Sequence, residues 1–166
     1  LAIAAARQAR QADAGEFGQH LLHQIQQVAL ARSAERPQRV FHARLLAMQV
    51  LQMGVEHLLE LGHRHILLVN GVPRSLTAKR RREGFRDAMK AAGVPLATVW
   101  ETRYGYSESA GRRALQRILA LGPRPTAVVV ANVNAAVGLL SAARAASVRV
   151  PDDLSVATVH DSWTAE

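Results

Sequence analysis

The stretch EHLLELGHRHILLVNG, residues 56–71, passes from a predicted helix into a strand and ends in polar residues. Its first part continues an apolar stripe at helical spacing that begins near residue 47, with Gly62 at the expected helix end. The continuous apolar run that follows predicts a buried strand over 65–70. The stretch therefore predicts a helix followed by one strand of a sheet that is covered on both faces.

The same alternation of helix and strand repeats along the rest of the chain. Apolar runs predict further strands at 96–102, 126–131 and 154–159. Periodic segments predict helices at 78–93, 107–121 and 134–146. Continuous apolar strands that alternate with helices indicate an α/β fold with a doubly wound parallel sheet.

The first part of the chain differs from this pattern. Residues 1–46 are rich in Ala, Gln, Arg and His, and the apolar spacing predicts a helix near 16–33. Pro37 is expected to break the helical pattern. The sequence therefore predicts a helical N-terminal segment, 1–46, followed by an α/β lobe over 47–166.

Composition narrows the classes of protein. The chain has 166 residues, 49% apolar residues, a net charge of +8 and no cysteine. The lack of cysteine excludes disulfides and thiolate catalysis and fits a cytoplasmic protein. No apolar run approaches the roughly 18 residues of a membrane span. The basic residues are scattered and aromatic residues are few, so no nucleic-acid-binding surface is predicted within this chain.

Polar side chains follow each predicted strand. The carboxyl ends of parallel strands lie at one edge of a sheet, and ligands bind outside that edge in open α/β folds. A ligand-binding site is therefore predicted there. The candidate residues at this edge are Asn70, Gly71, Arg103, Tyr104, Tyr106, Asn132, His160 and Asp161.

Four basic residues, Lys79 to Arg82, fall in the first turn of a predicted helix, where cations oppose the helix dipole. They are either a solvated charge run or include one arginine that points inward to a ligand. Arg81 lies four residues before Phe85, so the two share a flank of the helix. We expect Arg81 to point inward.

Metal binding and catalysis have no comparable pattern. His20 and His23, like His63 and His65, have no further ligand at metal-binding spacing, and His63 is expected to cap the preceding helix. Nucleotide-binding glycine loops and a Gly-x-Ser-x-Gly elbow are missing from the sequence. The pair at 152–153 precedes a strand and predicts a turn rather than catalytic carboxylates. We expect a binding protein without a cofactor, not an enzyme.

Four motifs in their order resemble the lactose/galactose-repressor (LacI/GalR) family of bacterial transcription regulators. They are EHLLELGHRHILLVNG, RREGFRDAMKAAGV, RPTAVVVAN and VPDDLSV, within about residues 48–162. The resemblance implies a periplasmic-binding-protein-like domain that binds a small effector, such as a sugar or nucleoside. It also implies a homodimer, and DNA binding through a helix-turn-helix that is not recognisable in this chain.

The resemblance also implies site residues. Arg81 matches the arginine that typically holds the effector, and Ser75 and Thr77 fall at pocket-lining positions before it. Tyr106 matches an aromatic residue that packs on the ligand, and Asn132 matches a polar contact. Two further positions follow the last strand: His160 stands where the family usually has an acid, and Asp161 matches the second acid of that pair.

The leading hypothesis is thus the truncated ligand-sensing domain of a LacI-type repressor. Two alternatives stay open at this point. One is a solute-binding protein of a sugar transporter, and the other is a remnant of a regulator without ligand function. The last predicted helix is rich in small residues, which would allow close packing on a partner or on its own sheet.

Overall fold

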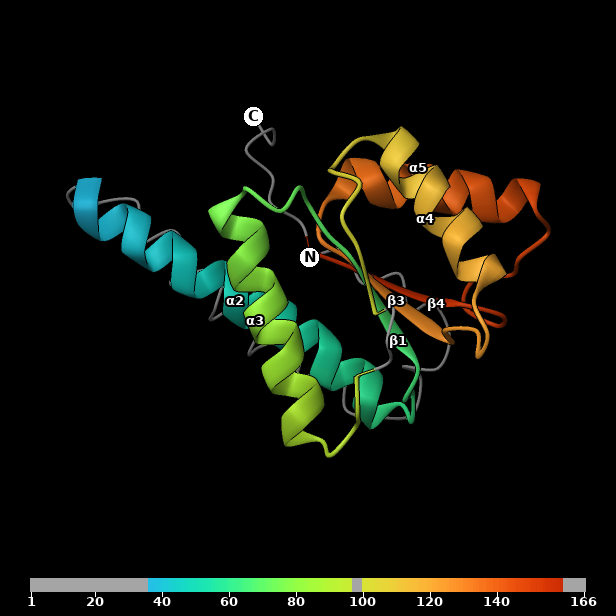
Figure 1. Cartoon of the computed structure of the whole chain (residues 1–166), viewed down its shortest axis with the longest axis horizontal. Helices are drawn as coiled ribbons and strands as arrows, with labels where there is room; N and C mark the ends of the chain where they lie inside the picture. The colour runs from blue at the N-terminus through green and yellow to red at the C-terminus, as the bar shows by residue number, and fades with distance from the viewer. Residues whose placement is uncertain (1–35, 97–99, 160–166) are drawn as a thin grey trace, which may run out of the picture.

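A computed structural model describes residues 36–96 and 100–159 of the chain, and side chains from residue 48 onward. Helices and strands alternate in the predicted order (Figure 1). The elements are α2 (Arg36–Glu60), β1 (Ile66–Val69), α3 (Leu76–Ala91), β2 (Glu101–Thr102), α4 (Glu108–Ala120), β3 (Ala127–Val130), α5 (Val133–Ala145) and β4 (Ser155–Thr158).

The four strands form one sheet in the order β2-β1-β3-β4, and each neighbouring pair is parallel. Register pairs Leu68 with Val129, and Val129 with Ala157. The chain winds from β1 outward to β2, then returns to the other side of β1 for β3 and β4. This reversal is the topological switch point at which α/β sheets bind ligands, and the predicted doubly wound parallel sheet is confirmed.

Two apolar cores cover the two faces of the sheet, with α2 and α3 on one face and α4 and α5 on the other (Figure 1). Neighbouring residues of a strand point to opposite faces, so both faces of β1 and β3 are apolar. The first core includes Leu51, Val55, Leu68, Phe85, Met89 and Val129. The second core includes Leu67, Val69, Leu115, Ile118, Val128 and Leu139. Each such side chain contributes about 1.5–3 kcal/mol by leaving water.

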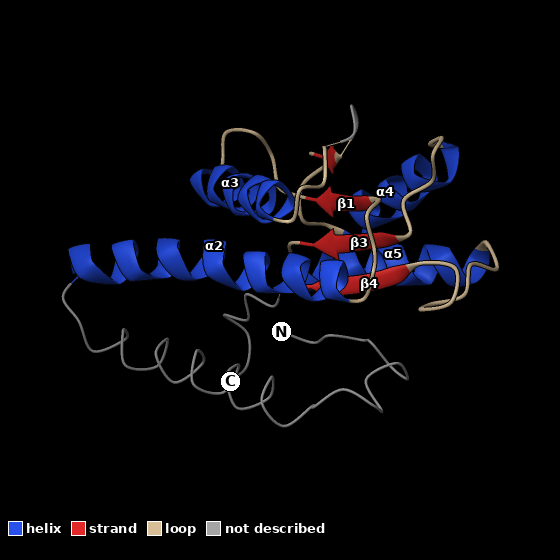
Figure 2. Cartoon of the chain, turned by 90° about the horizontal axis from the view of Figure 1, so that it is seen from below, coloured by secondary structure: helices blue, strands red, loops and turns tan. Residues whose placement is uncertain are grey.

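Helix α2 begins earlier than the sequence predicts. It starts at Arg36 and extends past the sheet (Figure 2), and Pro37 lies in its first turn. Proline is well tolerated there because its missing N–H would have no helical acceptor anyway. The expected break at Pro37 stays a prediction, because the residues before Arg36, where the earlier helix is predicted, lie outside the described residues. Helix α2 is continuous across position 46/47, while the predicted helix near 16–33 lies outside the described residues.

The strand β2 is shorter than predicted. It covers only Glu101–Thr102 of the predicted strand at 96–102, and residues 97–99 are outside the described ranges. Trp100, just before it, stacks on Phe85 with ring centroids 5.3 Å apart and an interplanar angle of 7°. The short edge strand is thus fixed to α3 by an aromatic contact.

Helices α4 and α5 pack backbone against backbone through two glycines. A β-carbon at Gly111 would overlap the backbone carbonyl oxygen of Ala135, and one at Gly138 would overlap that of Glu108. Each glycine thus faces the main chain of the opposite helix. The small-residue helix α5 therefore packs closely on α4 and on its own sheet.

The acidic residues at 152–153 lie in a turn before β4, as predicted, and an ion pair holds this turn. Arg149 donates from Nη2 to Oδ1 of Asp153 at 2.7 Å and from its backbone N–H to Oδ2 at 2.9 Å. These bonds lower the pKa of Asp153 to about 2. The pair serves the turn and lies before the strand, away from the strand ends that form the candidate site.

The end of α2 is capped by a different residue from the one predicted. Arg64, not His63, donates from Nη1 to the carbonyl oxygen of Leu59 at 2.8 Å. Nδ1 of His63 instead lies 3.0 Å from Oγ1 of Thr126, in the segment that leads into β3. An arginine reaches the last carbonyls of a helix more easily because its side chain is longer. Burial lowers the pKa of His63.

This lowered pKa predicts a pH dependence of stability. The unfolded chain binds a proton at His63 near pH 6.5 and the folded chain only at lower pH, so the free energy of unfolding falls as pH drops below about 6.5. In His63→Gln, which keeps a partner for Thr126, we expect this part of the fall to disappear. Urea unfolding between pH 7 and 5 measures it. The exposed neighbour provides the control: His65→Gln should keep the wild-type slope, and an unchanged slope in His63→Gln contradicts the prediction.

Candidate ligand-binding site

The carboxyl ends of β1, β2 and β3 bring most of the predicted residues to one edge of the sheet. Asn70 and Gly71 follow β1, Arg103 follows β2, and Asn132 follows β3. The strands pair in parallel, so these ends lie at the same side. His160 and Asp161, which follow β4 in sequence, lie outside the described residues, and their role stays a prediction.

Arg81 points inward, as predicted. Arg81 is only 3% exposed, although it lies in a run of charged residues in α3. Nη1 donates to the hydroxyl oxygen of Tyr106 at 3.2 Å, and the guanidinium carbon lies 5.7 Å from the centroid of the Tyr106 ring. A residue of α3 and a residue of the β2–α4 connection therefore meet at the candidate site.

The position of Tyr106 depends on Gly71. A β-carbon at Gly71 would overlap the ring and hydroxyl of Tyr106, so a glycine is needed after β1 for the ring to lie there. Tyr106 is half-buried. Its ring and the Arg81 guanidinium together present an aromatic surface and N–H donors, a combination suited to a small polar molecule with an apolar face.

Two predicted residues act as helix caps. Ser75 accepts from the backbone N–H of Ala78 at 3.3 Å and caps α3. Asn132 accepts from the backbone N–H of Asn134 at 2.8 Å and caps α5, while its side-chain NH₂ makes no hydrogen bond within the described residues. Thr77 lies half-buried in the first turn of α3. These caps fix where both helices start beside the candidate site.

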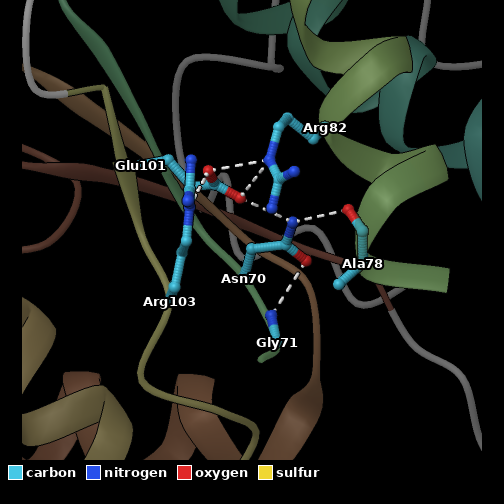
Figure 3. A network of polar contacts seen from close by, with 6 residues as sticks. All are labelled: Asn70, Gly71, Ala78, Arg82, Glu101 and Arg103. Atoms are coloured by element: carbon cyan, nitrogen blue, oxygen red, sulfur yellow. Dashed lines mark hydrogen bonds and ion pairs between the residues drawn. The ribbon is translucent and has the colours of Figure 1, made fainter. Parts of the chain in front are cut away.

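A buried polar network joins the elements that carry the site (Figure 3). Asn70, 0% exposed, donates from Nδ2 to the carbonyl oxygen of Ala78 at 2.8 Å and to Oε1 of Glu101 at 2.9 Å. Its Oδ1 accepts from the backbone N–H of Gly71 at 2.9 Å. One side chain thus links β1, β2 and the first turn of α3.

Two arginines form ion pairs with Glu101. Arg82 donates from Nε to Oε1 at 3.1 Å and to Oε2 at 2.9 Å, and Arg103 donates from Nε to Oε2 at 2.7 Å (Figure 3). The Glu101 side chain is 3% exposed. Sequence reasoning missed Glu101 and Arg82. The available signal was an acid inside the predicted strand at 96–102 together with a run of arginines in the helix that precedes it.

The predicted residues thus divide into three groups. Arg81 and Tyr106 are in direct contact, Ser75 and Asn132 cap helices at the same edge, and Thr77 lies next to Ala78 in the first turn of α3. Within the described residues there is no group of three or more His, Cys, Asp or Glu side chains that could hold a metal ion. The helices described are also too short or too polar to cross a membrane.

Comparison with known proteins identifies the class. Residues 55–166 match the model of the periplasmic binding protein-like domain, so the chain belongs to this family. Its relatives are LacI-type regulators, and the resemblance to the LacI/GalR family is confirmed. The chain is 33% identical over 105 residues to the probable HTH-type transcriptional repressor ExuR of Bacillus subtilis. The aligned residues cover 63% of this chain and 32% of that protein. It is 37% identical over 101 residues to the HTH-type transcriptional repressor PurR of Mannheimia succiniciproducens. The aligned residues cover 61% of this chain and 30% of that protein.

Solved structures agree. A LacI family transcriptional regulator from Mycobacterium smegmatis matches with a TM-score of 0.65 and 39% identity, over 70% of this chain and 44% of that one. A sugar-binding transcriptional regulator of the LacI family from Escherichia coli, complexed with phosphate, matches with a TM-score of 0.66 and 26% identity. This match covers 70% of this chain and 42% of that one. The chain spans about a third of the length of the curated relatives it matches.

Proposed function

We propose that this chain is the ligand-sensing domain of a LacI-type transcriptional repressor. A small effector, such as a sugar or nucleoside, binds at the carboxyl edge of the sheet and changes the DNA affinity of the whole regulator. DNA binding belongs to a helix-turn-helix in the longer protein, which acts as a homodimer in the cytoplasm. The role of the domain is binding, without catalysis and without a cofactor.

The observation that carries this proposal is the contact between Arg81 and Tyr106 above Gly71. Arg81 is buried and donates from Nη1 to the hydroxyl of Tyr106, so a charged donor and an aromatic ring are held together at this edge. The site lies at the switch point of the sheet, where the fold class binds its ligands. Thr77 and Asn132 are the further polar side chains proposed to contact the effector, with Ser75 beside them. His160 and Asp161 complete the proposed set.

The relatives favour a regulator over the two alternatives. Both named curated relatives are transcriptional repressors, and both named solved structures are transcriptional regulators. A transport protein is therefore the less favoured reading. A remnant without ligand function would bind no effector, so replacing Arg81 would change no binding. The following experiment tests this difference.

Replacing Arg81 should abolish most of the effector binding. Titration calorimetry with a panel of sugars, nucleosides and purines first finds a ligand of the wild-type chain. In Arg81→Gln we expect its dissociation constant to rise by roughly 10- to 100-fold, because a hydrogen bond from a charged donor contributes about 1.5–3 kcal/mol. Arg80→Gln is the matched control, since Arg80 is exposed and pairs with Glu83 at 3.0 Å.

Two results would count against the proposal. One is a folded wild-type chain, by circular dichroism, that binds no compound of the panel. The other is Arg81→Gln with the affinity of the wild type. A remnant predicts the first of these results.

A further inference from the structure

Both arginines beside Glu101 contact it through the same kind of atom. Arginine commonly pairs with a carboxylate through two nitrogens in a parallel fork. Here Arg82 and Arg103 each use Nε alone, and both Nε atoms lie within 3 Å of the same oxygen, Oε2, at 2.9 and 2.7 Å. The terminal nitrogens of both guanidinium groups therefore make no hydrogen bond to Glu101.

One of these nitrogens is buried. Nη2 of Arg82 is buried and has no hydrogen-bond partner among the described residues. The Arg82 side chain as a whole is 20% exposed. A buried donor without a partner costs about 1–3 kcal/mol, and more for a charged group. The Arg103 side chain is 50% exposed and makes no hydrogen bond through its terminal nitrogens in the described part of the chain. An acceptor with negative charge would satisfy both groups.

The charges of the cluster also favour an anion. Two guanidinium groups meet one carboxylate, so the three side chains carry an excess positive charge around Glu101, whose side chain is 3% exposed, while Arg103 reaches the surface. Charges interact more strongly around a buried side chain than on an open surface. Asn70, the third donor to Glu101, adds no negative charge.

The cluster adjoins the candidate ligand site. Arg82 follows Arg81 in α3, and Arg103 begins the connection that carries Tyr106. Asn70 links the cluster to Gly71 (Figure 3). The Tyr106 ring lies against Gly71. We propose that the effector carries an anionic group, a carboxylate or phosphate, and that Arg82 and Arg103 bind it while Arg81 and Tyr106 hold the neutral part. This inference rests on the proposed sensing function.

Pairs of compounds that differ in charge test this inference by calorimetry on the 166-residue chain. D-glucuronate is compared with D-glucose, and adenosine 5′-monophosphate with adenosine. We expect the anionic member of at least one pair to bind tenfold more tightly or better, and added sodium chloride to weaken it. Arg82→Gln and Arg103→Gln should each remove this advantage. Arg86→Gln, exposed on the same helix, should keep it.

Inorganic phosphate alone distinguishes two sources of the anion. Weaker binding of phosphate than of adenosine 5′-monophosphate supports an anionic group of the effector, whereas equal binding overturns that assignment in favour of a free anion. Equal affinity within both pairs, or an unchanged advantage in both variants, overturns the inference. If neutral compounds still bind and Arg81→Gln abolishes this, the sensing function stands and only the anion is wrong. If no compound of any pair binds, the sensing function also fails for these ligand classes.

Discussion

Gly138→Ala is expected to lower the free energy of unfolding by about 1–3 kcal/mol, the usual cost of overpacking a close-packed interior. Alanine favours a helix by about 0.8–1 kcal/mol over glycine, so the packing cost must exceed this gain. It does so because the new methyl group would overlap the backbone carbonyl of Glu108, and a main chain cannot rotate out of the way as a side chain can. Helices α4 and α5 must move apart, which loosens the core beneath them. Urea unfolding with linear extrapolation measures the loss.

A glycine elsewhere in the chain serves as the matched control. Gly54 lies in α2, and a β-carbon there would have no neighbour within 4 Å. Gly54→Ala should therefore stabilise the chain through helix propensity alone. Gly111→Ala combined with Gly138→Ala should cost less than the sum of the two, because the first methyl group already separates the helices. If Gly138→Ala is as stable as Gly54→Ala, the backbone contact is not as close as described.

Asn70→Asp is expected to lower the free energy of unfolding by about 2–6 kcal/mol at neutral pH, because two buried acceptors lose their donor at about 1–3 kcal/mol each. The change replaces an NH₂ donor by a second carboxylate, next to Oε1 of Glu101 and the carbonyl oxygen of Ala78. Both neighbours are acceptors, so two hydrogen bonds become repulsive contacts. Urea unfolding of the variant against the wild type measures the difference.

The pH dependence of this variant has a definite sign. Burial and the direct contact with the Glu101 carboxylate raise the pKa of the new side chain above the usual value of about 3.9, against the opposing effect of Arg82 and Arg103, which pair with Glu101. We expect the protonated acid to be favoured in the folded state. The loss of stability is therefore small below about pH 4 and grows as pH rises. Adding Glu101→Gln to Asn70→Asp should restore part of the stability, because donor and acceptor are then exchanged. A loss that is the same at every pH would argue against this electrostatic origin.

The fold was predictable because its signal is periodic and strong. The apolar runs at 66–69 and 127–130 are buried on both faces, and only a parallel sheet between two helical layers accommodates strands of that kind. The start of α2 was not predictable in the same way. Proline ends a helix in its interior but suits its first turn, and local sequence alone does not distinguish these two positions at Pro37.

The candidate site was predictable only where strand order determines it. The inward side of Arg81 was predicted from its spacing to Phe85 together with the family resemblance, and its contact with Tyr106 is seen in the structure. The link between Asn70 and Glu101 joins residues 31 positions apart on neighbouring strands, so it depends on a register that no local motif encodes. Arg64 rather than His63 lies at the end of α2 for a different reason: the longer side chain of Arg64 reaches the carbonyl oxygen of Leu59.

The helix caps at Ser75 and Asn132 have a consequence for changing what the domain recognises. Each lies at the candidate site and also starts a helix, so a substitution that alters ligand contacts there also removes a cap, at a cost of about 1 kcal/mol. Thr77 makes no capping hydrogen bond within the described residues, and Tyr106 lies in the connection between β2 and α4. A library that diversifies the recognition of the domain is therefore best built at Thr77 and Tyr106, with the two capping positions restricted to Ser, Thr, Asn and Asp. Natural change of specificity is subject to the same restriction.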